Sequence, residues 1–176
     1  MVVDQAGAFI DDVYAGAGEK GLAHSHEVGD LLAALGADDE TVAAGLLHDV
    51  VEDTGIALDD VRGAFGDRIA DLVGALTEDP DIPAYPERKQ ALREAIGRAG
   101  PAALAVSAAD KVARLRAADR RGSTLPARKV EHYERTLEML RAHGIHTTHT
   151  DELRRRLRAH DLRRRERTAA APALRP

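Results

Sequence analysis

The chain of 176 residues contains no cysteine, and only 3% of its residues are aromatic. Without cysteine it has neither a disulfide framework nor a thiolate metal site, which leaves histidine and carboxylate as the plausible metal ligands. No segment approaches about 18 uninterrupted apolar residues, and the first residues lack a basic region followed by an apolar run. We therefore expect a soluble, cytoplasmic protein with no membrane segment.

Strand signals are nearly absent, whereas strong helix formers, above all alanine and leucine, are abundant. A chain of this length can bury one sizeable core, and the apolar periodicity predicts that this core is all-α. The predicted helices cover residues 3–15, 25–35, 39–54, 59–65, 67–77, 86–98, 102–118, 126–142 and 150–167. Residues 79–86, with three prolines, cannot be helical; this loop either borders a pocket or is a plain connector.

Four polar side chains interrupt the apolar helix predicted over residues 39–54: His48, Asp49, Glu52 and Asp53. At about 100° of turn per residue they fall on one arc, roughly opposite Leu47. Such a face is often simply solvated, as charged faces of surface helices usually are. It can equally be a site built from carboxylates and imidazoles, if further ligands come from elsewhere in the chain.

Further ligands exist upstream and downstream. A divalent cation needs several nitrogen and oxygen ligands, and His24, His48, Asp49 and Asp110 would supply two imidazoles and two carboxylates. Asp110 lies in the most apolar stretch of the chain, residues 104–112, where a carboxylate is costly unless it is paired or bound to metal. An ion pair with a neighbouring arginine is the competing interpretation of Asp110.

Residues 45–54, Gly-Leu-Leu-His-Asp-Val-Val-Glu-Asp-Thr, carry a specific signature. Together with an earlier histidine and a distant aspartate, they resemble the HD superfamily of metal-dependent phosphohydrolases. More narrowly, they are similar to the hydrolase domain of the RelA/SpoT homologues, which degrade the alarmone ppGpp. The resemblance covers about residues 8–120 and implies an all-α, HD-domain helical bundle.

The resemblance also implies roles for individual residues. It makes His24, His48, Asp49 and Asp110 the ligands of one metal ion. The favoured ion is Mn²⁺, with Mg²⁺, Fe²⁺, Co²⁺ or Ni²⁺ as alternatives. The resemblance makes Glu52 and Asp53 the pair that handles protons and positions the attacking water. His26 competes with His24, but only His24 matches the family register. His26 is expected to point to another side of its helix.

The chain also departs from the family it resembles. The segment that packs on the guanine base in alarmone hydrolases corresponds to residues 15–22, which contain no arginine and only Lys20 as a cation. The family's His-Asn pair, whose asparagine helps to hold the nucleotide, is replaced by Ala113-Arg114. Lys111 and Arg114 are expected to attract a phosphate, although they could equally pair with acidic neighbours. These departures leave ppGpp itself open as the substrate.

The C-terminal end is basic, with nine arginines against four acids in residues 151–176. We divide the chain into an HD phosphohydrolase domain at 1–145, an Arg-rich helix at 146–167 packed on or appended to it, and a disordered tail at 168–176. Leu153, Leu157 and Leu162 are expected to dock this helix on the acidic body. The alternative is an appendage that binds nucleic acid or a partner.

The leading hypothesis is a metal-dependent phosphohydrolase that cleaves a phosphate or pyrophosphate ester of a small nucleotide, similar to guanosine-3′,5′-bis(diphosphate) 3′-pyrophosphohydrolase. A non-catalytic module that binds metal or nucleotide is the first alternative, and an RNA-associated protein acting through the Arg-rich end is the weaker one. The expected partner is a small-molecule nucleotide. No membrane partner is expected, and a nucleic acid is not the favoured partner. The chain could form a homo-oligomer.

Overall fold

The computed structural model describes residues 1–15 and 19–170, with side chains described for 1–15 and 21–166. Within these ranges the chain forms ten α-helices and no β-strand, which confirms the all-α prediction. The helices are α1 (Val2–Tyr14), α2 (Glu19–Ala34), α3 (Asp39–Leu47), α4 (Val50–Thr54), α5 (Leu58–Phe65), α6 (Asp67–Leu76), α7 (Tyr85–Ala99), α8 (Pro101–Arg120), α9 (Ala127–Ala142) and α10 (Thr148–Ala170). Over the same residues no helix is long and apolar enough to cross a membrane.

Local sequence signals account for several helix boundaries. The Asp38 carboxylate caps α3 by accepting a hydrogen bond of 2.9 Å from the Thr41 backbone N–H. Gly55 ends α4 in the left-handed conformation, with φ of 76°, which favours glycine. Pro101 occupies the first turn of α8, where its missing N–H leaves no hydrogen bond unmade. These signals fix the ends of three helices that border the site described below.

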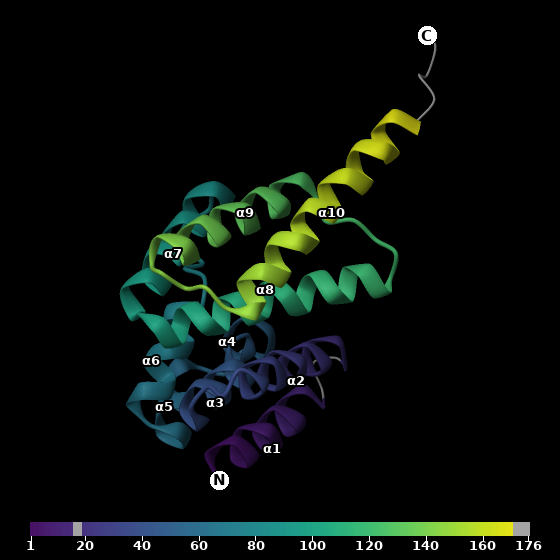
Figure 1. The fold of residues 1–176 in the computed structure, drawn as a ribbon. Helices are drawn as coiled ribbons and strands as arrows, with labels where there is room; N and C mark the ends of the chain where they lie inside the picture. Colours follow the sequence, from purple (N-terminus) through teal and green to yellow (C-terminus); the bar gives the residue numbers. More distant parts are fainter. Residues whose placement is uncertain (16–18, 171–176) are drawn as a thin grey trace.

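Helix α8 forms the centre of the molecule. In Figure 1 it runs across the middle, with α1 to α5 on one side and α9 and α10 on the other. It packs against α2, α3, α6, α7, α9 and α10. Most of its residues are buried, including the charged neighbours Asp110 and Lys111. Because buried charges are costly unless they are paired or bind a metal, this segment of α8 must be satisfied by its surroundings.

The prediction of one helix over residues 39–54 is wrong, because the chain bends at His48-Asp49. Helix α3 ends at Leu47 and α4 begins at Val50. Asp49 has φ of −100° and ψ of −3°, in the sparsely populated region between helix and strand conformations. The Asp49 carbonyl then accepts the backbone N–H of Asp53 at 2.9 Å, which starts α4. The bend therefore places His48 and Asp49 at a junction instead of on a continuous helix face.

Helix α2 begins at Glu19, six residues before the predicted start at residue 25. His24 thus lies inside the helix and not at its beginning. Glycine is a poor helix former, so Gly21 weakens the local signal. Its role is steric, because a Cβ atom at Gly21 would lie 2.4 Å from the Tyr14 ring. Glycine here allows α1 to approach α2 closely.

Helix α10 packs against α8 and α9 (Figure 1). Leu153 and Leu157 are buried in the core, but Leu162 is 61% exposed, so the expectation that it docks the helix is wrong. The reason is geometric: α10 runs beyond the end of the bundle and leaves its distal turns without a neighbour. The helix continues to Ala170, into the segment expected to be disordered, and residues 171–176 lie outside the described part of the chain.

Candidate metal centre

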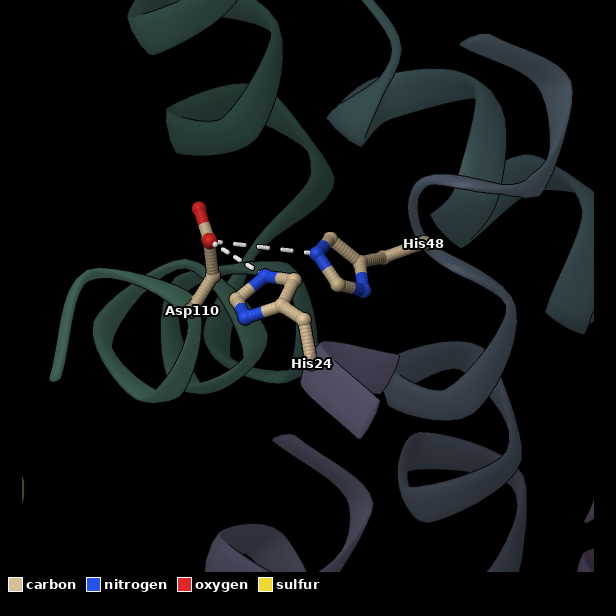
Figure 2. A group of neighbouring side chains, drawn as sticks. All are labelled: His24, His48 and Asp110. Carbon is tan, nitrogen blue, oxygen red and sulfur yellow. Dashed lines mark hydrogen bonds and ion pairs between the residues drawn. The ribbon is translucent and has the colours of Figure 1, made fainter. Parts of the chain in front are cut away.

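His24, His48 and Asp110 converge where α2, the bend between α3 and α4, and α8 meet (Figure 2). One ligand atom from each residue lies within 4.8 Å of those of the other two. Asp110 Oδ1 lies 3.1 Å from His24 Nε2 and 3.8 Å from His48 Nε2. Ligand atoms at about 2.0–2.2 Å from one metal ion lie roughly 3–4 Å from each other. The spacing therefore suits a single divalent ion.

Close packing of α2 on α3 brings the two imidazoles together. A Cβ atom at Gly45 would lie 2.2 Å from the Leu32 side chain, so only glycine permits this approach. As a result, the ring centroids of His24 and His48 are 5.2 Å apart. The Gly45 residue of the sequence signature thus has a packing role in assembling the site.

The orientation of His48 is fixed by a backbone hydrogen bond. Its Nδ1 donates to the Gly45 carbonyl at 2.8 Å, which leaves Nε2 facing the other candidate ligands. This Nε2 atom is buried and has no hydrogen-bond partner among the described residues. Burial lowers the pKa of His48, but the negative charges of Asp49 and Asp110 outweigh burial and raise this pKa to about 10. The two carboxylates thus favour a cation at Nε2.

Asp49 lies beside the three-residue group. Its Oδ1 is 3.2 Å from His48 Nε2 and its Oδ2 is 3.6 Å from His24 Nε2, so each imidazole faces a different oxygen. Burial raises the pKa of Asp49, but the charge of His48 and the neighbouring Arg114 overcome burial and hold this pKa below its usual range. Asp49 is therefore an ionised carboxylate within reach of both histidines.

Asp110 is also held by two cations from its own helix. Lys111 Nζ donates to Asp110 Oδ2 at 2.6 Å, and Arg114 Nε donates to Asp110 Oδ1 at 2.7 Å. The Arg114 guanidinium reaches Asp49 as well and so bridges the two carboxylates. Burial opposes ionisation of Asp110, yet these cations hold its pKa well below the ordinary value. The structure thus combines the two interpretations of Asp110, an ion pair and a potential metal ligand.

The cluster opens into a cavity of about 240 Å³ between α4, α7, α8 and α9. Glu52 and Asp53 line it together with His48 and Asp49, so the bend still gathers the four polar side chains of the signature. Glu52 Oε1 accepts the Glu78 backbone N–H at 2.6 Å. Asp53 Oδ2 accepts the Tyr14 hydroxyl at 3.1 Å. Burial raises the pKa of Glu52, and this effect is larger than the opposing effect of the hydrogen bond from the Glu78 backbone.

Several residues of the cavity were not foreseen. Lys89 comes from α7, and Lys129, His132 and Tyr133 come from α9. Tyr85 also lines the cavity, and it belongs to the segment 79–86 for which the sequence left open that it borders a pocket. Lys129 and Tyr133 are four residues apart on one helix, so the sequence indicates that they share a helix face. It does not indicate that this face lines the cavity. Nothing local connects α7 and α9 with the signature, since the two helices meet the cavity through tertiary packing.

Two further residues considered from the sequence do not join the cluster. His26 points to α1, where its Nε2 lies 2.9 Å from an Asp11 carboxylate oxygen. Lys20 lies in the first turn of α2, but its side chain lies outside the described residues. Of the candidate ligands, the structure brings together His24, His48 and Asp110, with Asp49 adjacent.

The sequence model of the HD domain family matches residues 3–138. The chain belongs to the HD domain family.

Several relatives are similar to this chain over part of its length. A probable guanosine-3′,5′-bis(diphosphate) 3′-pyrophosphohydrolase from Synechocystis is 46% identical over 61 residues, 35% of this chain and 8% of that protein. The human enzyme of the same name is 42% identical over 73 residues, 42% of this chain and 40% of that protein. The chain therefore spans less than half the length of these curated relatives.

A solved structure described as a metazoan orthologue of SpoT that hydrolyses ppGpp shares the fold. Its TM-score is 0.75 at 23% sequence identity, over 90% of this chain and 94% of that one. The likeness confirms the HD-type helical bundle predicted from the sequence.

The HD domain implies a divalent metal, and the residues present fit one. The set offers two imidazoles and two carboxylates, a mixture suited to Mn²⁺, Fe²⁺ and similar ions. The buried Nε2 of His48 lacks a hydrogen-bond partner within the described part of the chain, and its ring is held by the Gly45 carbonyl, as in metal-ligating histidines generally. A metal at this position would replace the proton that the carboxylates attract to His48.

Proposed function

We propose that this chain is a metal-dependent phosphohydrolase that cleaves a phosphate or pyrophosphate ester of a small nucleotide. One observation carries the proposal: the cluster of His24, His48 and Asp110 opens into a cavity that is also lined by further acids, Glu52 and Asp53 among them, and by several cations. Acids beside a metal centre suit proton transfer, and cations suit a phosphate group. The names of the relatives agree with this reaction class.

His24, His48, Asp49 and Asp110 would hold the ion, for which Mn²⁺ is our first choice. When bound, such an ion supplies a water of lowered pKa and polarises a phosphoryl oxygen. The chain's own contribution is to orient the ligands: the Gly45 carbonyl holds His48, and the cations of α8 hold Asp110.

Glu52 and Asp53 are the groups we assign to proton transfer and water positioning. The Glu78 backbone N–H holds Glu52, and the Tyr14 hydroxyl holds Asp53, so both carboxylates are fixed at the cavity wall. The raised pKa of Glu52 makes it a better proton acceptor than an ordinary glutamate near neutral pH. We assign the general-base role to Glu52 and the positioning role to Asp53.

The cations of the cavity would bind the phosphate end of the substrate. Lys111 and Arg114 neutralise the ligand carboxylates, and Arg114, whose side chain is 38% exposed, can also reach a phosphate or ribose oxygen. Lys129 lines the same cavity, and no ion pair to it occurs among the described residues. We infer that phosphate recognition is stronger than base recognition in this cavity.

The substrate class follows from the same residues. The relatives are named for guanosine-3′,5′-bis(diphosphate), but here the family's His-Asn pair is replaced by Ala113, which is buried, and Arg114, which pairs with carboxylates. Losing one hydrogen-bonding or stacking partner costs about 1–3 kcal/mol, roughly 5- to 150-fold in affinity. We infer weak discrimination between guanine and adenine nucleotides.

The test is a screen of the purified, Mn²⁺-loaded protein against nucleoside phosphates and pyrophosphates, with free phosphate and pyrophosphate both assayed. His48→Ala and Asp110→Ala should abolish both bound metal and hydrolysis, whereas His26→Ala serves as the matched control and should retain both. Stoichiometric Mn²⁺ in Asp110→Ala, measured by elemental analysis, would refute the ligand set. Arg114→Ala should raise KM more than it lowers kcat.

A second candidate is a non-catalytic module that binds metal or nucleotide. The observation that favours it is the Arg114 guanidinium, which already bridges both candidate ligand carboxylates. The screen separates the two candidates, because the module would bind metal and nucleotides without releasing phosphate or pyrophosphate.

A further inference from the structure

A second, smaller cavity of about 90 Å³ lies between α7 and α9, beside the cavity of the candidate metal centre. Three side chains line both cavities: Tyr85, Lys89 and His132. The other lining residues include three arginines, and the only carboxylate among them is Glu131. The second cavity is therefore separated from the first by a thin wall and is lined mainly by positive charge.

Two of these cations have no acidic partner. Lys89 pairs with Glu78, and Arg135 pairs with Glu131 at 2.8 Å. By contrast, no carboxylate within the described part of the chain lies at ion-pair distance from Arg93 or Arg128.

Arg93 is the more informative of the two, because it is partly buried. Its Nη1 donates to His132 Nδ1 at 2.9 Å. Burial, together with Lys111, Lys89 and Arg93, lowers the pKa of His132 to about 2, so this imidazole is neutral and offers no negative charge. Burial and the nearby Arg135 also lower the pKa of Arg93. A guanidinium in these surroundings would gain from an anion.

Tyr85, which lines the same cavity, has an unpaired hydroxyl among the described residues. The Tyr85 hydroxyl oxygen is buried and has no hydrogen-bond partner among the residues described. The Arg128 guanidinium lies 5.1 Å from the centre of the Tyr85 ring. Buried hydroxyl groups are normally hydrogen-bonded, so an orphaned one on a side chain that lines the same cavity as Arg93 and Arg128 is a second, independent sign of a ligand.

We propose that this second cavity binds a phosphate group through Arg93, Arg128 and the Tyr85 hydroxyl. A volume of about 90 Å³ is large enough for one tetrahedral oxyanion. Guanidinium groups bind phosphate oxygens in pairs, and the hydroxyl would donate to a third oxygen. The phosphate is either a second phosphate group of the nucleotide in the neighbouring cavity, which rests on the proposed function, or a separate anion.

The first experiment needs no activity. Binding of inorganic phosphate to the metal-loaded full chain is measured by calorimetry for Arg93→Gln, Arg128→Gln and the control Arg98→Gln, an exposed position on α7 outside the cavity lining. Phosphate bound near the metal is common to all variants, so the comparison isolates the second cavity. We expect the phosphate affinity of this cavity to fall about 10- to 100-fold in Arg93→Gln and Arg128→Gln and to stay unchanged in the control.

Arg128 is exposed, so Arg128→Gln should fold normally even if Arg93→Gln does not. Arg93→Lys should recover part of the affinity, because it retains the charge but not the paired donors. The same phosphate binding in Arg93→Gln, Arg128→Gln and Arg98→Gln would overturn the proposal, whatever the protein hydrolyses.

A second experiment distinguishes the two sources of the phosphate. If the phosphate belongs to the substrate, Arg93→Gln raises KM for a nucleoside 3′-pyrophosphate that also carries a 5′-phosphate, but not for a nucleoside 3′-pyrophosphate without the 5′-phosphate. Free phosphate then competes only with the substrate that carries the 5′-phosphate. If it is a separate anion, Arg93→Gln leaves both KM values unchanged, and phosphate binds alongside substrate. A hydrolase assay that fails altogether would contradict the proposed function, but it leaves the calorimetric result intact.

Discussion

Replacing Asp110 with alanine should do more than remove a metal ligand. Lys111 is only 6% exposed, and Asp110 accepts its ammonium hydrogen bond at 2.6 Å. Removing one partner of a buried ion pair costs about 3–5 kcal/mol, since the other charge stays buried without a counterion. For a chain of this size, each kcal/mol lowers Tm by roughly 2–4 °C. We therefore expect Asp110→Ala to lower Tm by about 6–20 °C with chelator present, so that lost metal does not contribute.

The matched rescue is Lys111→Met, which removes the buried charge and keeps a similar volume. The double variant Asp110→Ala/Lys111→Met should recover most of the lost Tm in chelator and still bind no metal. Urea denaturation and elemental analysis of the same preparations measure stability and metal separately. If the double variant is no more stable than Asp110→Ala, then Asp110 does not stabilise the fold by compensating Lys111, and the reasoning fails.

Three further predictions follow from the same contacts. Glu52→Gln should retain the metal and lose about 10²–10⁴-fold in kcat, and an unchanged kcat would remove Glu52 from the mechanism. Because burial raises the pKa of Glu52, the wild-type rate should fall as the pH drops through that raised pKa. Hydrogen bonds from Arg116 lower the pKa of Glu152 from 4.5 to about 2, so its contribution to stability should be complete above pH 4.5 and lost as the pH falls toward 2; acid unfolding of Glu152→Gln should lack this component. Leu153→Ala should cost about 2–5 kcal/mol in urea unfolding because Leu153 is fully buried, and Leu162→Ala, at an exposed position, should stay within about 0.5 kcal/mol; equal effects would mean that α10 does not pack as described.

The helical fold could be predicted because its signals are local. Apolar periodicity and the prolines of residues 79–86 each act within a few residues. The bend at His48-Asp49 was missed because the apolar pattern continues through it, whereas tertiary packing and the Asp49 conformation decide the break. The early start of α2 was missed because Gly21 weakens a local signal that close packing of Tyr14 overrides.

The candidate site divides in the same way. The histidines and aspartates of the signature could be found because their spacing is specific, and Asp110 because a carboxylate in an apolar stretch demands a partner. The cations of α7 and the polar residues of α9 could not, because their position depends on how these helices pack against α8. The sequence also does not reveal that Arg93 contacts His132 and no carboxylate among the described residues, since that depends on tertiary packing.

The contact between His24 and Asp110 joins residues that are 86 positions apart in the chain. A metal ion bound to both would act as a cross-link that closes a loop of this length, and closing long loops removes the most entropy from the unfolded chain. Binding would also be selective for the folded state, because α2, the bend and α8 supply the ligands only when they are packed together. Metal occupancy would then raise the free energy of unfolding, so a cell that starves this protein of metal would lose folded protein along with the proposed activity.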